Sequence, residues 1–591
     1  MNNLYLTFAD FKKTKRSGKS FFLGPWFNEN NIFLGKKSLD YHWLNLNKIE
    51  KDYRYLYRLK KKIFIYLTKK LNKYHSLNYS NQSWSIVVEP FLQMYLTILF
   101  DRWEIISNLN NKKRYNVNFY KFNNKQNDFK DTEDLINRSF QDHWNHCLFQ
   151  DIFLFKKLKN IRIKNSKRSL IGKKNFIGDQ TVNSFKQKLI ELIVNFFCIF
   201  KKKFDFFFFD HSLSKQFFFK IHIINKSFPY FSNKIPKLKF NYSLSKKNTQ
   251  LRENIFIDYQ INKKDFFKNF FVNKFKKDIP TFLIEDFKLI NSQINKFDIK
   301  PKFIFSQNNH WYNQIFKTWL ANKVSNGSKL IIMEHGGSFP YRYPYFNFEE
   351  DMCDYLIKWF KPMHKKHYQI SGFQIYKNNL ITEGNSEQEF LDRKNCTVIY
   401  DRFFNYTLTI PQPVTGSDYI AFNNLKDFER NLNEDIKKIL KIKFHPADDK
   451  NMMSVKKIFS KYNEKEKNIA NSFKKSRFII CFYPETTFSE AISLNIPTVL
   501  FFPKGVYKID QKTKKLINSL KRSKIIFDNP KKMADHINLY WNNPYKWWHD
   551  KNTIKSINFF KKEALGISKQ NTLEDKWKNF FNKIKFKNEY R

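Results

Sequence analysis

Short apolar runs alternate with amphipathic segments in two parts of the chain, and this alternation restricts the fold more than any other feature. The strand predicted at 302–306 is followed by a helix that stops at Gly327 and by a second strand at 330–333. Strand, helix and strand at this spacing form a βαβ unit, which requires a parallel sheet. The sequence therefore predicts an α/β fold.

The same pattern returns in the C-terminal third of the chain. A strand at 478–482 leads into a loop and a short helix. Further strand candidates are IPTVLFF at 496–502 and SKIIF at 523–527, and KKILKIKF at 437–444 is a helix end or a strand. We therefore expect two α/β blocks joined near 370–395. The expected division is an N-terminal domain at 1–384, with a Lys/Asn/Phe-rich insertion at about 155–290, a C-terminal domain at 385–560, and a basic helix or tail at 561–591.

Size and charge limit the possible functions. A chain of 591 residues exceeds the usual size of a single core. The formal charge of +53 would suit a nucleic-acid-binding protein. However, the lysines are spread along the whole chain beside abundant Asn, Ile and Phe, which is typical of a compositional bias. A basic nucleic-acid-binding protein therefore stays an alternative rather than the first interpretation.

Cysteine usage and apolar runs bear on localisation. The five cysteines lie far apart without a CxxC pair, so neither a zinc site nor a disulfide framework is indicated. The N-terminus lacks the pattern of a signal peptide, and we expect a cytoplasmic protein. The apolar run at 189–210 is broken by charged residues and is shorter than a bilayer span. It predicts a buried helix followed by a strand, with an interfacial membrane contact as the alternative.

Polar residues that can do chemistry follow the ends of the predicted strands. In an open parallel sheet, ligands bind outside the carboxyl ends of the strands, where helix N-termini and loop amides converge. The residues at or just beyond such ends are Asn308, His310, Glu334, His335, His445, Glu485, Thr486, Thr487 and Glu490. These residues are the candidate site.

Each candidate also has a structural interpretation. Thr487 and Glu490 have the spacing of a capping box, and the same helix N-terminus could bind a phosphate. His445 could be an ordinary loop histidine, or an imidazole that donates to a phosphate oxygen. Gly336 and Gly337 could form a tight turn or allow close approach of a ligand. No P-loop, GxGxxG, HExxH or GxSxG pattern occurs, which disfavours the common kinase, dehydrogenase, metalloprotease and serine hydrolase classes.

Six motifs in order along the chain resemble a family of transferases encoded in bacterial O-antigen and surface-polysaccharide loci. The motifs are FLGPW at 22–26, DRW at 101–103, HWN at 143–145, FIFSQNNHWYNQIFKTWLANKVSNGSKLIIMEHGG at 303–337, FHP at 444–446 and TTFSEAISLNIPTVLF at 486–501. The family is similar to glycosyltransferases of the GT-B architecture, in which two Rossmann-like domains face each other across a cleft. The resemblance implies this fold, with helical and irregular insertions in the N-terminal half.

The resemblance also implies roles for individual residues. The pair His445 and Pro446, followed by a hydroxyl-rich loop, is similar to enzymes that transfer Kdo or sialic acid from CMP-activated donors. By this resemblance His445 contacts the phosphate of the nucleotide, Thr486 and Thr487 bind the same phosphate, and Glu490 faces the ribose or nucleoside. The N-terminal domain would bind the acceptor, which is a surface polysaccharide or lipopolysaccharide.

Transfer of a sugar also needs a base or nucleophile at the anomeric centre. His335, with Glu334 beside it, is the first candidate, and Asp351 and Asp354 are weaker ones. Asn308, Gly336 and Gly337 are expected to contact the donor. No DxD-like triplet stands in a convincing loop, so we expect no metal and no cofactor other than a nucleotide-sugar co-substrate, which is a CMP-sugar by the resemblance.

Two further expectations follow. A protein rich in basic and aromatic residues could bind the cytoplasmic face of the inner membrane peripherally. A glycerophosphate or phosphosugar transferase of GT-B fold, with a histidine in each domain, would explain His335 and His445 equally well.

Overall fold

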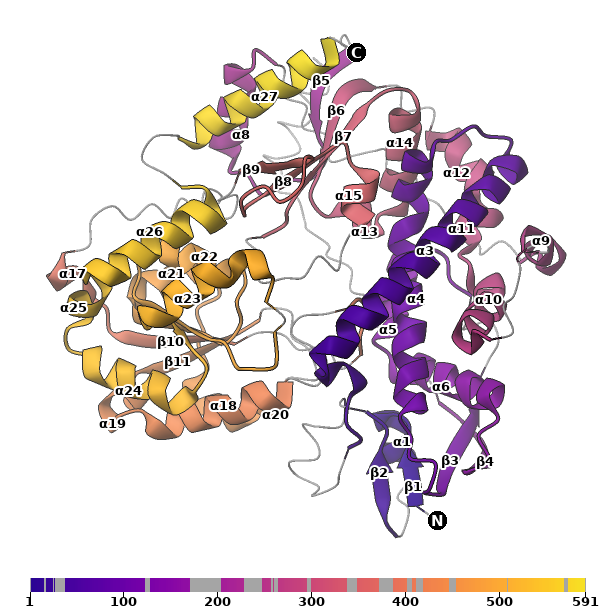
Figure 1. The fold of residues 1–591 in the computed structure, drawn as a ribbon, viewed down its shortest axis with the longest axis horizontal. Helices are drawn as coiled ribbons and strands as arrows, with labels where there is room; N and C mark the ends of the chain where they lie inside the picture. Colours follow the sequence, from indigo (N-terminus) through magenta and orange to yellow (C-terminus); the bar gives the residue numbers. More distant parts are fainter. Residues whose placement is uncertain are drawn as a thin grey trace.

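The computed structural model describes residues 2–14, 18–24, 26, 38–122, 128–170, 203–227, 247–256, 259, 264–294, 299–336, 348–370, 386–400, 406–410, 418–445, 453–507, 509–567 and 572–589. Within these ranges the strands form three separate sheets, and every pairing between strands is parallel. The two larger sheets have five strands each and lie side by side (Figure 1). The predicted α/β class with a GT-B-like pair of parallel sheets is confirmed.

The central sheet has the strand order β5-β6-β7-β8-β9. Its strands are β5 (Lys203–Phe208), β6 (Lys300–Ser306), β7 (Lys329–Met333), β8 (Tyr355–Lys358) and β9 (His367–Gln369). Successive side chains point to opposite faces: Phe207 and Ile304 belong to one core, whereas Phe206 and Phe305 belong to the other. Because both faces are buried, these strands appear as continuous apolar runs in the sequence.

Helices cover both faces of the central sheet. The Ile304 face packs against the N-terminal helices and α14, and the Phe305 face packs against α8 and the C-terminal helix. The helices between β5 and β8 along the chain are α8 (Lys215–Ile224), α9 (Thr249–Ile255), α10 (Phe266–Asp278), α11 (Thr281–Ile284), α12 (Phe287–Ile294), α13 (Asn309–Tyr312), α14 (Gln314–Ser325) and α15 (Phe348–Met352). The strands predicted at 302–306 and 330–333 and the helix between them are thus confirmed.

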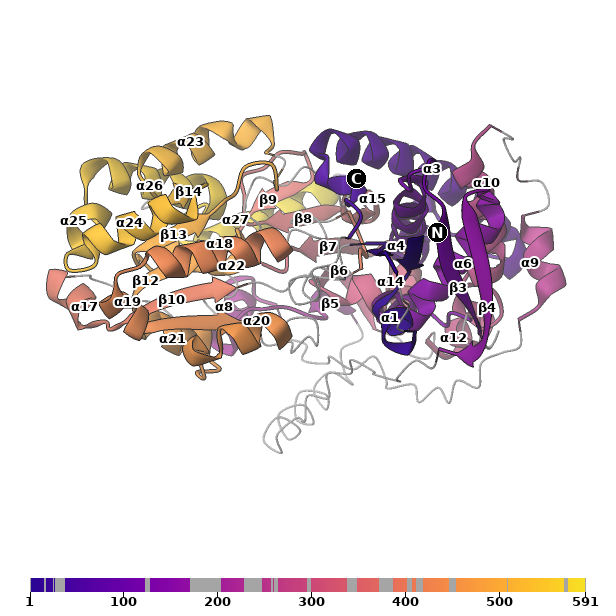
Figure 2. The same cartoon turned by 90° about the horizontal axis from the view of Figure 1, so that it is seen from below.

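The C-terminal sheet has the strand order β11-β10-β12-β13-β14. Its strands are β10 (Asn395–Tyr400), β11 (Leu440–Phe444), β12 (Ser476–Cys481), β13 (Thr498–Phe501) and β14 (Ile526–Phe527). Its helices are α17 (Glu387–Asp392), α18 (Asp418–Asn431), α19 (Glu434–Lys438), α20 (Met453–Ile458), α21 (Ile469–Lys475), α22 (Thr486–Ser493), α23 (Lys514–Arg522), α24 (Pro530–Tyr540), α25 (Pro544–Trp548) and α26 (Lys551–Leu565). Figure 2 shows this sheet between helices on both sides.

The first 169 residues contain a third, smaller sheet that the sequence did not predict as a separate unit. Its order is β2-β1-β3-β4, with β1 (Asn2–Tyr5), β2 (Ser20–Phe22), β3 (Tyr115–Lys121) and β4 (Ile161–Ser169). Its helices are α1 (Phe8–Lys13), α3 (Leu46–His75), α4 (Asn81–Ser107), α5 (Thr132–Ser139) and α6 (Asp142–Lys156). By length and composition α4 could cross a membrane, but 94% of its apolar window is buried inside the protein. Here α4 is a core helix.

The region at 155–290 was expected to be an insertion, but parts of it belong to two of the sheets. It supplies β4 to the N-terminal sheet and β5 to the central sheet. Its Phe-rich run lacks a visible period because side chains on both faces of β5 are buried. The strand predicted at the end of the 189–210 run is therefore observed, while the helix predicted before it lies outside the described residues.

The end of the chain returns to the central sheet. Helix α26 ends at Gly566, which adopts the left-handed conformation, and α27 (Leu573–Glu589) follows. Trp577 and Phe581 of α27 are fully buried, and Phe581 packs against Phe206 of β5. The segment expected as a basic helix or tail is thus a helix that completes one face of the central sheet (Figure 1).

A short segment after β10 is anchored in the N-terminal core. Arg102, which is fully buried, donates from Nη1 to Asp101 Oδ2 (2.7 Å) and to the Thr407 carbonyl oxygen (2.8 Å), and from Nε to Asn145 Oδ1 (3.0 Å). The ring of Tyr406 packs against Trp26 in a tilted arrangement with 4.8 Å between centroids. The DRW, HWN and FLGPW motifs therefore meet at one buried network that binds the segment 406–410.

Candidate functional site

The loops that follow β7 and β12 are in contact with each other. A Cβ atom added at Gly336 would overlap with Thr486 Oγ1, so only glycine leaves room for this approach. Gly336 follows the carboxyl end of β7, and Thr486 follows the carboxyl end of β12. The carboxyl edges of the central and C-terminal sheets therefore face each other here, and two predicted site residues from separate sheets lie together.

Helix α22 begins at Thr486 without a side-chain cap. Glu485 is the N-cap residue, and its carboxylate makes no capping hydrogen bond to the helix. Thr487 is the second helical residue, so the capping box proposed from Thr487 to Glu490 is wrong. The first amide groups of this eight-residue helix and the two hydroxyls lie together at its positive end, where an anion is stabilised.

His335 is held by Asn308. The side-chain amide of Asn308 lies 2.9 Å from Nδ1 and 3.5 Å from Nε2 of the exposed His335 imidazole. Asn308 is held in turn by Asp210, whose Oδ2 accepts from the backbone amides of Asn308 (2.5 Å) and Asn309 (3.0 Å). Asp210 follows β5, a strand that was not predicted as part of this sheet, so sequence reasoning missed it.

His310 lies behind this pair in a buried chain of hydrogen bonds. Its Nδ1 is 3.0 Å from Ser306 Oγ, which donates to Asp210 Oδ1 (2.8 Å), and its Nε2 is 2.9 Å from Glu349 Oε1. Burial raises the pKa of Glu349, but the hydrogen bonds from His310 and Trp311 and the nearby positive charges together outweigh it, and the pKa of Glu349 is lowered overall. His310 is fully buried, so it supports the strand ends and does not contact a substrate.

The structure separates the acidic candidates from His335. Glu334 Oε2 accepts from the backbone amide of Trp359 (2.9 Å), so its carboxylate binds the end of the neighbouring strand β8. Asp354 accepts from the backbone amide of Leu330 (2.9 Å) at the start of β7. Asp354 thus lies at the amino edge of the sheet, and its assignment as a catalytic residue is wrong. The sequence did not predict β8, so the edge to which Asp354 belongs could not be recognised.

His445 is exposed directly after β11. Strand β11 is two positions from β12 in the sheet, so His445 and the loop after β12 share the carboxyl edge about 10 Å apart by strand spacing. Gly337 and Pro446 lie outside the described residues.

Glu490 has an unusual environment. It lies four residues after Thr486 and therefore on the same side of α22. Its side chain is 4% exposed, and Oε1 has no hydrogen-bond partner among the described residues. Burial raises the pKa of Glu490 from the ordinary 4.5 to about 8. The carboxyl is therefore protonated at neutral pH and can both donate and accept a hydrogen bond.

Glu490→Gln is expected to change how stability depends on pH. Because the pKa in the folded protein is raised, the native state retains a proton that the unfolded chain has released between about pH 4.5 and 8. The unaltered protein should therefore lose stability as pH rises through this window, and the neutral amide should not. We therefore measure the melting temperature of Glu490→Gln minus that of the unaltered protein. This difference should increase as pH rises from 4.5 to 8. A constant difference across this range would contradict the burial of this carboxyl.

One cluster in the described residues has the composition of a metal site. Glu350, His364 and His367 place potential ligand atoms within 4.8 Å of one another. However, Nδ1 of His364 and Nδ1 of His367 accept from the backbone amides of Lys366 (3.3 Å) and Met363 (3.4 Å). In a neutral imidazole Nε2 then carries the proton, and Nε2 of His367 lies 2.7 Å from Glu350 Oε1. This geometry favours a hydrogen-bonded cluster over a metal site.

Several solved structures are distantly similar to this chain. S. aureus MnaA with UDP is 11% identical, covers 51% of this chain and 78% of its own, and has a TM-score of 0.32. The wall teichoic acid polymerase TagF with CDPG is 11% identical, covers 50% of this chain and 74% of its own, and has a TM-score of 0.29. Acinetobacter baumannii MurG is 10% identical, covers 49% and 72%, and has a TM-score of 0.24. These values are too low to carry an argument about this chain.

No curated protein matches the sequence. The family model for LIC12162 family transferases, in contrast, matches residues 4–581, which takes in strands of all three sheets and the first nine residues of the 17-residue helix α27. The chain therefore belongs to the LIC12162 family of transferases.

Proposed function

We propose that this transferase moves a sugar from a nucleotide-activated donor to a glycan acceptor at the facing edges of the two five-stranded sheets. The observation that carries the proposal is the contact between Gly336 and Thr486, which brings an uncapped helix N-terminus next to the loop that bears His335. A group transfer from a nucleotide needs a stabilised leaving phosphate and a base within reach of one another.

The donor phosphate would bind at the start of α22. Its oxygens would accept hydrogen bonds from the Thr486 and Thr487 hydroxyls and the first helical amides, and His445 would donate from the same sheet edge. Glu490, protonated and on the same side of the helix as Thr486, would bind a hydroxyl of the ribose. Each of these contacts is to the nucleotide part of the donor.

His335 would act on the acceptor. When the acceptor hydroxyl attacks the anomeric carbon, its proton passes to Nε2 of His335, the new glycosidic bond forms, and the bond from that carbon to the donor phosphate oxygen breaks. With Asn308 next to Nδ1, the ring is held in one orientation for this transfer. Accepting the proton requires the tautomer with Nδ1 protonated, in which Asn308 presents its oxygen.

The donor and acceptor classes follow from the motif resemblance. We propose a CMP-sugar as donor, a surface polysaccharide or lipopolysaccharide as acceptor, and no metal requirement. The reaction would take place in the cytoplasm, with peripheral contact to the inner membrane. A panel of CMP-, CDP- and UDP-activated donors tests the proposal by release of the free nucleotide. Release from CMP-sugars alone is expected, and no release from any donor would contradict it.

His445→Ala and the pair of changes Thr486→Val and Thr487→Val are expected to lower turnover at least tenfold. Losing one charge-assisted hydrogen bond costs about 1.5 to 3 kcal/mol, and about 1.4 kcal/mol is a factor of ten in rate. Valine retains the shape of threonine, so the contact with Gly336 should persist. Nucleotide affinity and melting temperature are measured on the same variants. Unchanged affinity in both would remove these residues from the donor site.

A glycerophosphate or phosphosugar transferase is the second candidate. The observation that favours it is one exposed histidine from each of the two facing edges, His335 and His445, which suits transfer of a phosphoryl-linked group as well as of a sugar. Release of CMP from CDP-glycerol, but not from CMP-sugars, would favour this reaction. Membership of a transferase family makes a dedicated nucleic-acid-binding role the weaker alternative.

A further inference from the structure

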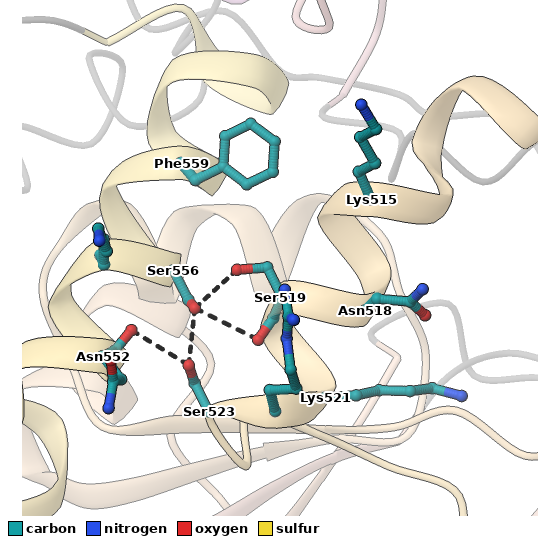
Figure 3. A pocket seen from close by; sticks show the side chains of 10 residues that line it. Lys515, Asn518, Ser519, Lys521, Ser523, Asn552, Ser556 and Phe559 are labelled. Atoms are coloured by element: carbon teal, nitrogen blue, oxygen red, sulfur yellow. Dashed lines mark hydrogen bonds between the residues drawn. The ribbon is translucent and has the colours of Figure 1, made fainter.

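A hollow of about 960 Å³ lies between α23 and α26 on the outer side of the C-terminal sheet (Figure 3). It is lined by Lys515, Asn518, Ser519, Lys521, Arg522, Ser523, Asn552, Lys555, Ser556 and Phe559. Sites for small molecules occupy about 300 to 1,000 Å³, so the hollow is large enough for a ligand bigger than a single phosphate.

The lining carries four positive charges and no carboxylate. The cationic side chains are Lys515, Lys521, Arg522 and Lys555. Among the described residues none of the four forms an ion pair, whereas exposed lysines elsewhere in the same domain do, as Lys438 does with Asp435 (3.2 Å). Four like charges around one hollow repel each other and produce a positive potential that an anion would neutralise.

The helix dipole does not account for these charges. Lys521 and Arg522 lie in the last turn of α23, where cations are favourable. Lys515, however, lies in the first turn of the same helix, which contains no acidic residue, so it faces the positive end of the dipole. Lys555 is in the second turn of α26. This placement of positive charges is electrostatically unfavourable in the protein alone. A bound anion would offset the repulsion between them.

Hydroxyl groups form the floor of the hollow. Ser556 Oγ lies 2.8 Å from Ser519 Oγ and 2.6 Å from Ser523 Oγ, and Figure 3 shows the three hydroxyls turned toward one another. Ser523 and Ser556 are buried, while Lys515 and Phe559 lie at the opposite wall of the hollow. Hydroxyl and amide donors beside lysine and arginine are the groups that proteins use to bind phosphate oxygens.

The hollow is separate from the candidate transfer site. Ser523 lies just before β14, at the amino edge of the C-terminal sheet, whereas Thr486 lies at its carboxyl edge. We propose that the hollow binds the phosphate groups of an anionic ligand, either the headgroup of an anionic lipid or a soluble phosphate ester. The cationic side chains pair with the phosphate oxygens, and the Ser519 hydroxyl and the Asn518 side-chain amide donate hydrogen bonds to them.

The test compares two triple variants that remove the same charge. Lys521→Gln, Arg522→Gln and Lys555→Gln change the hollow, and Lys457→Gln, Lys474→Gln and Lys475→Gln change exposed lysines of α20 and α21 outside it. The soluble probe is inorganic pyrophosphate, measured by titration calorimetry. The lipid probe is cosedimentation with phosphatidylglycerol vesicles, with phosphatidylcholine vesicles as the neutral reference. The full chain is used, and melting temperatures verify that the variants are folded.

We expect the hollow variant to lose at least tenfold in affinity for the probe that binds, and the control variant to retain it. Loss of vesicle binding alone identifies a lipid headgroup, and loss of pyrophosphate binding alone identifies a soluble ester. The hollow variant should retain its affinity for the nucleotide, which distinguishes the hollow from the donor site. Equal affinity in the two triple variants, or binding of neither probe by the unaltered protein, would overturn the proposal.

Discussion

Gly336→Ala is expected to lower turnover by about a hundredfold, because a misplacement of about 1 Å between reacting groups costs this much. The new Cβ would overlap with Thr486 Oγ1, so the loop after β7 and the start of α22 must move apart. Gly336 and Thr486 belong to neither of the two buried cores, so we expect the melting temperature to change little. Nucleotide release under saturating donor measures the effect.

Thr486→Ala provides the matched control for the glycine change. Combined with Gly336→Ala it removes the atom that the new Cβ would meet, so the double variant should turn over faster than Gly336→Ala alone if the collision is the cause. A Gly336→Ala enzyme with normal turnover would show that transfer does not need the close approach of the two loops.

Arg102→Met is expected to lower the free energy of unfolding by about 3 to 5 kcal/mol, the usual cost of removing one member of a buried ion pair. Asp101 is 1% exposed and would lose its charged hydrogen-bond donor, and the Thr407 carbonyl oxygen would lose its anchor. Denaturant and thermal unfolding measure the loss. The segment 406–410 should also become accessible to proteases.

Arg54→Met is the control for the buried arginine. Arg54 pairs with Glu50 at 2.6 Å, but its side chain is 64% exposed, and exposed pairs contribute less than about 1 kcal/mol. If the two variants unfold alike, the buried network does not stabilise the N-terminal core. A loss of turnover in Arg102→Met at temperatures where it remains folded would indicate that the anchored segment also positions the C-terminal sheet.

Much of the α/β pattern could be predicted because its signals are local. The strand at 478–482 and the helix after it appear as β12 and α22 within two residues at their starts, since apolar runs and the switch in period are visible in the chain itself. Local spacing was also misleading. Thr487 and Glu490 have the spacing of a capping box, yet the helix starts two residues earlier than that motif requires.

Other residues could not be assigned without the fold. Asp210 supports Asn308 only because β5 pairs with β6, although about a hundred residues separate them in the chain. Asp354 has a carboxylate of the kind used in catalysis. However, it precedes a strand, and this places it at the amino edge of the sheet. Trp577 and Phe581 appear as part of a basic tail until α27 packs on the central sheet.

The sequence by itself determined that the chain folds into parallel sheets and that its reactive side chains follow strand ends, because hydrophobic period and turn residues act over a few positions. Only the tertiary structure decided which strand ends meet. Gly336 and Thr486 touch across two sheets, and DRW joins a segment three hundred residues away, because side-chain packing between distant elements selects these contacts. The local sequence pattern contains no information about these long-range contacts. The contact between Gly336 and Thr486 brings two separate loops together into one candidate site.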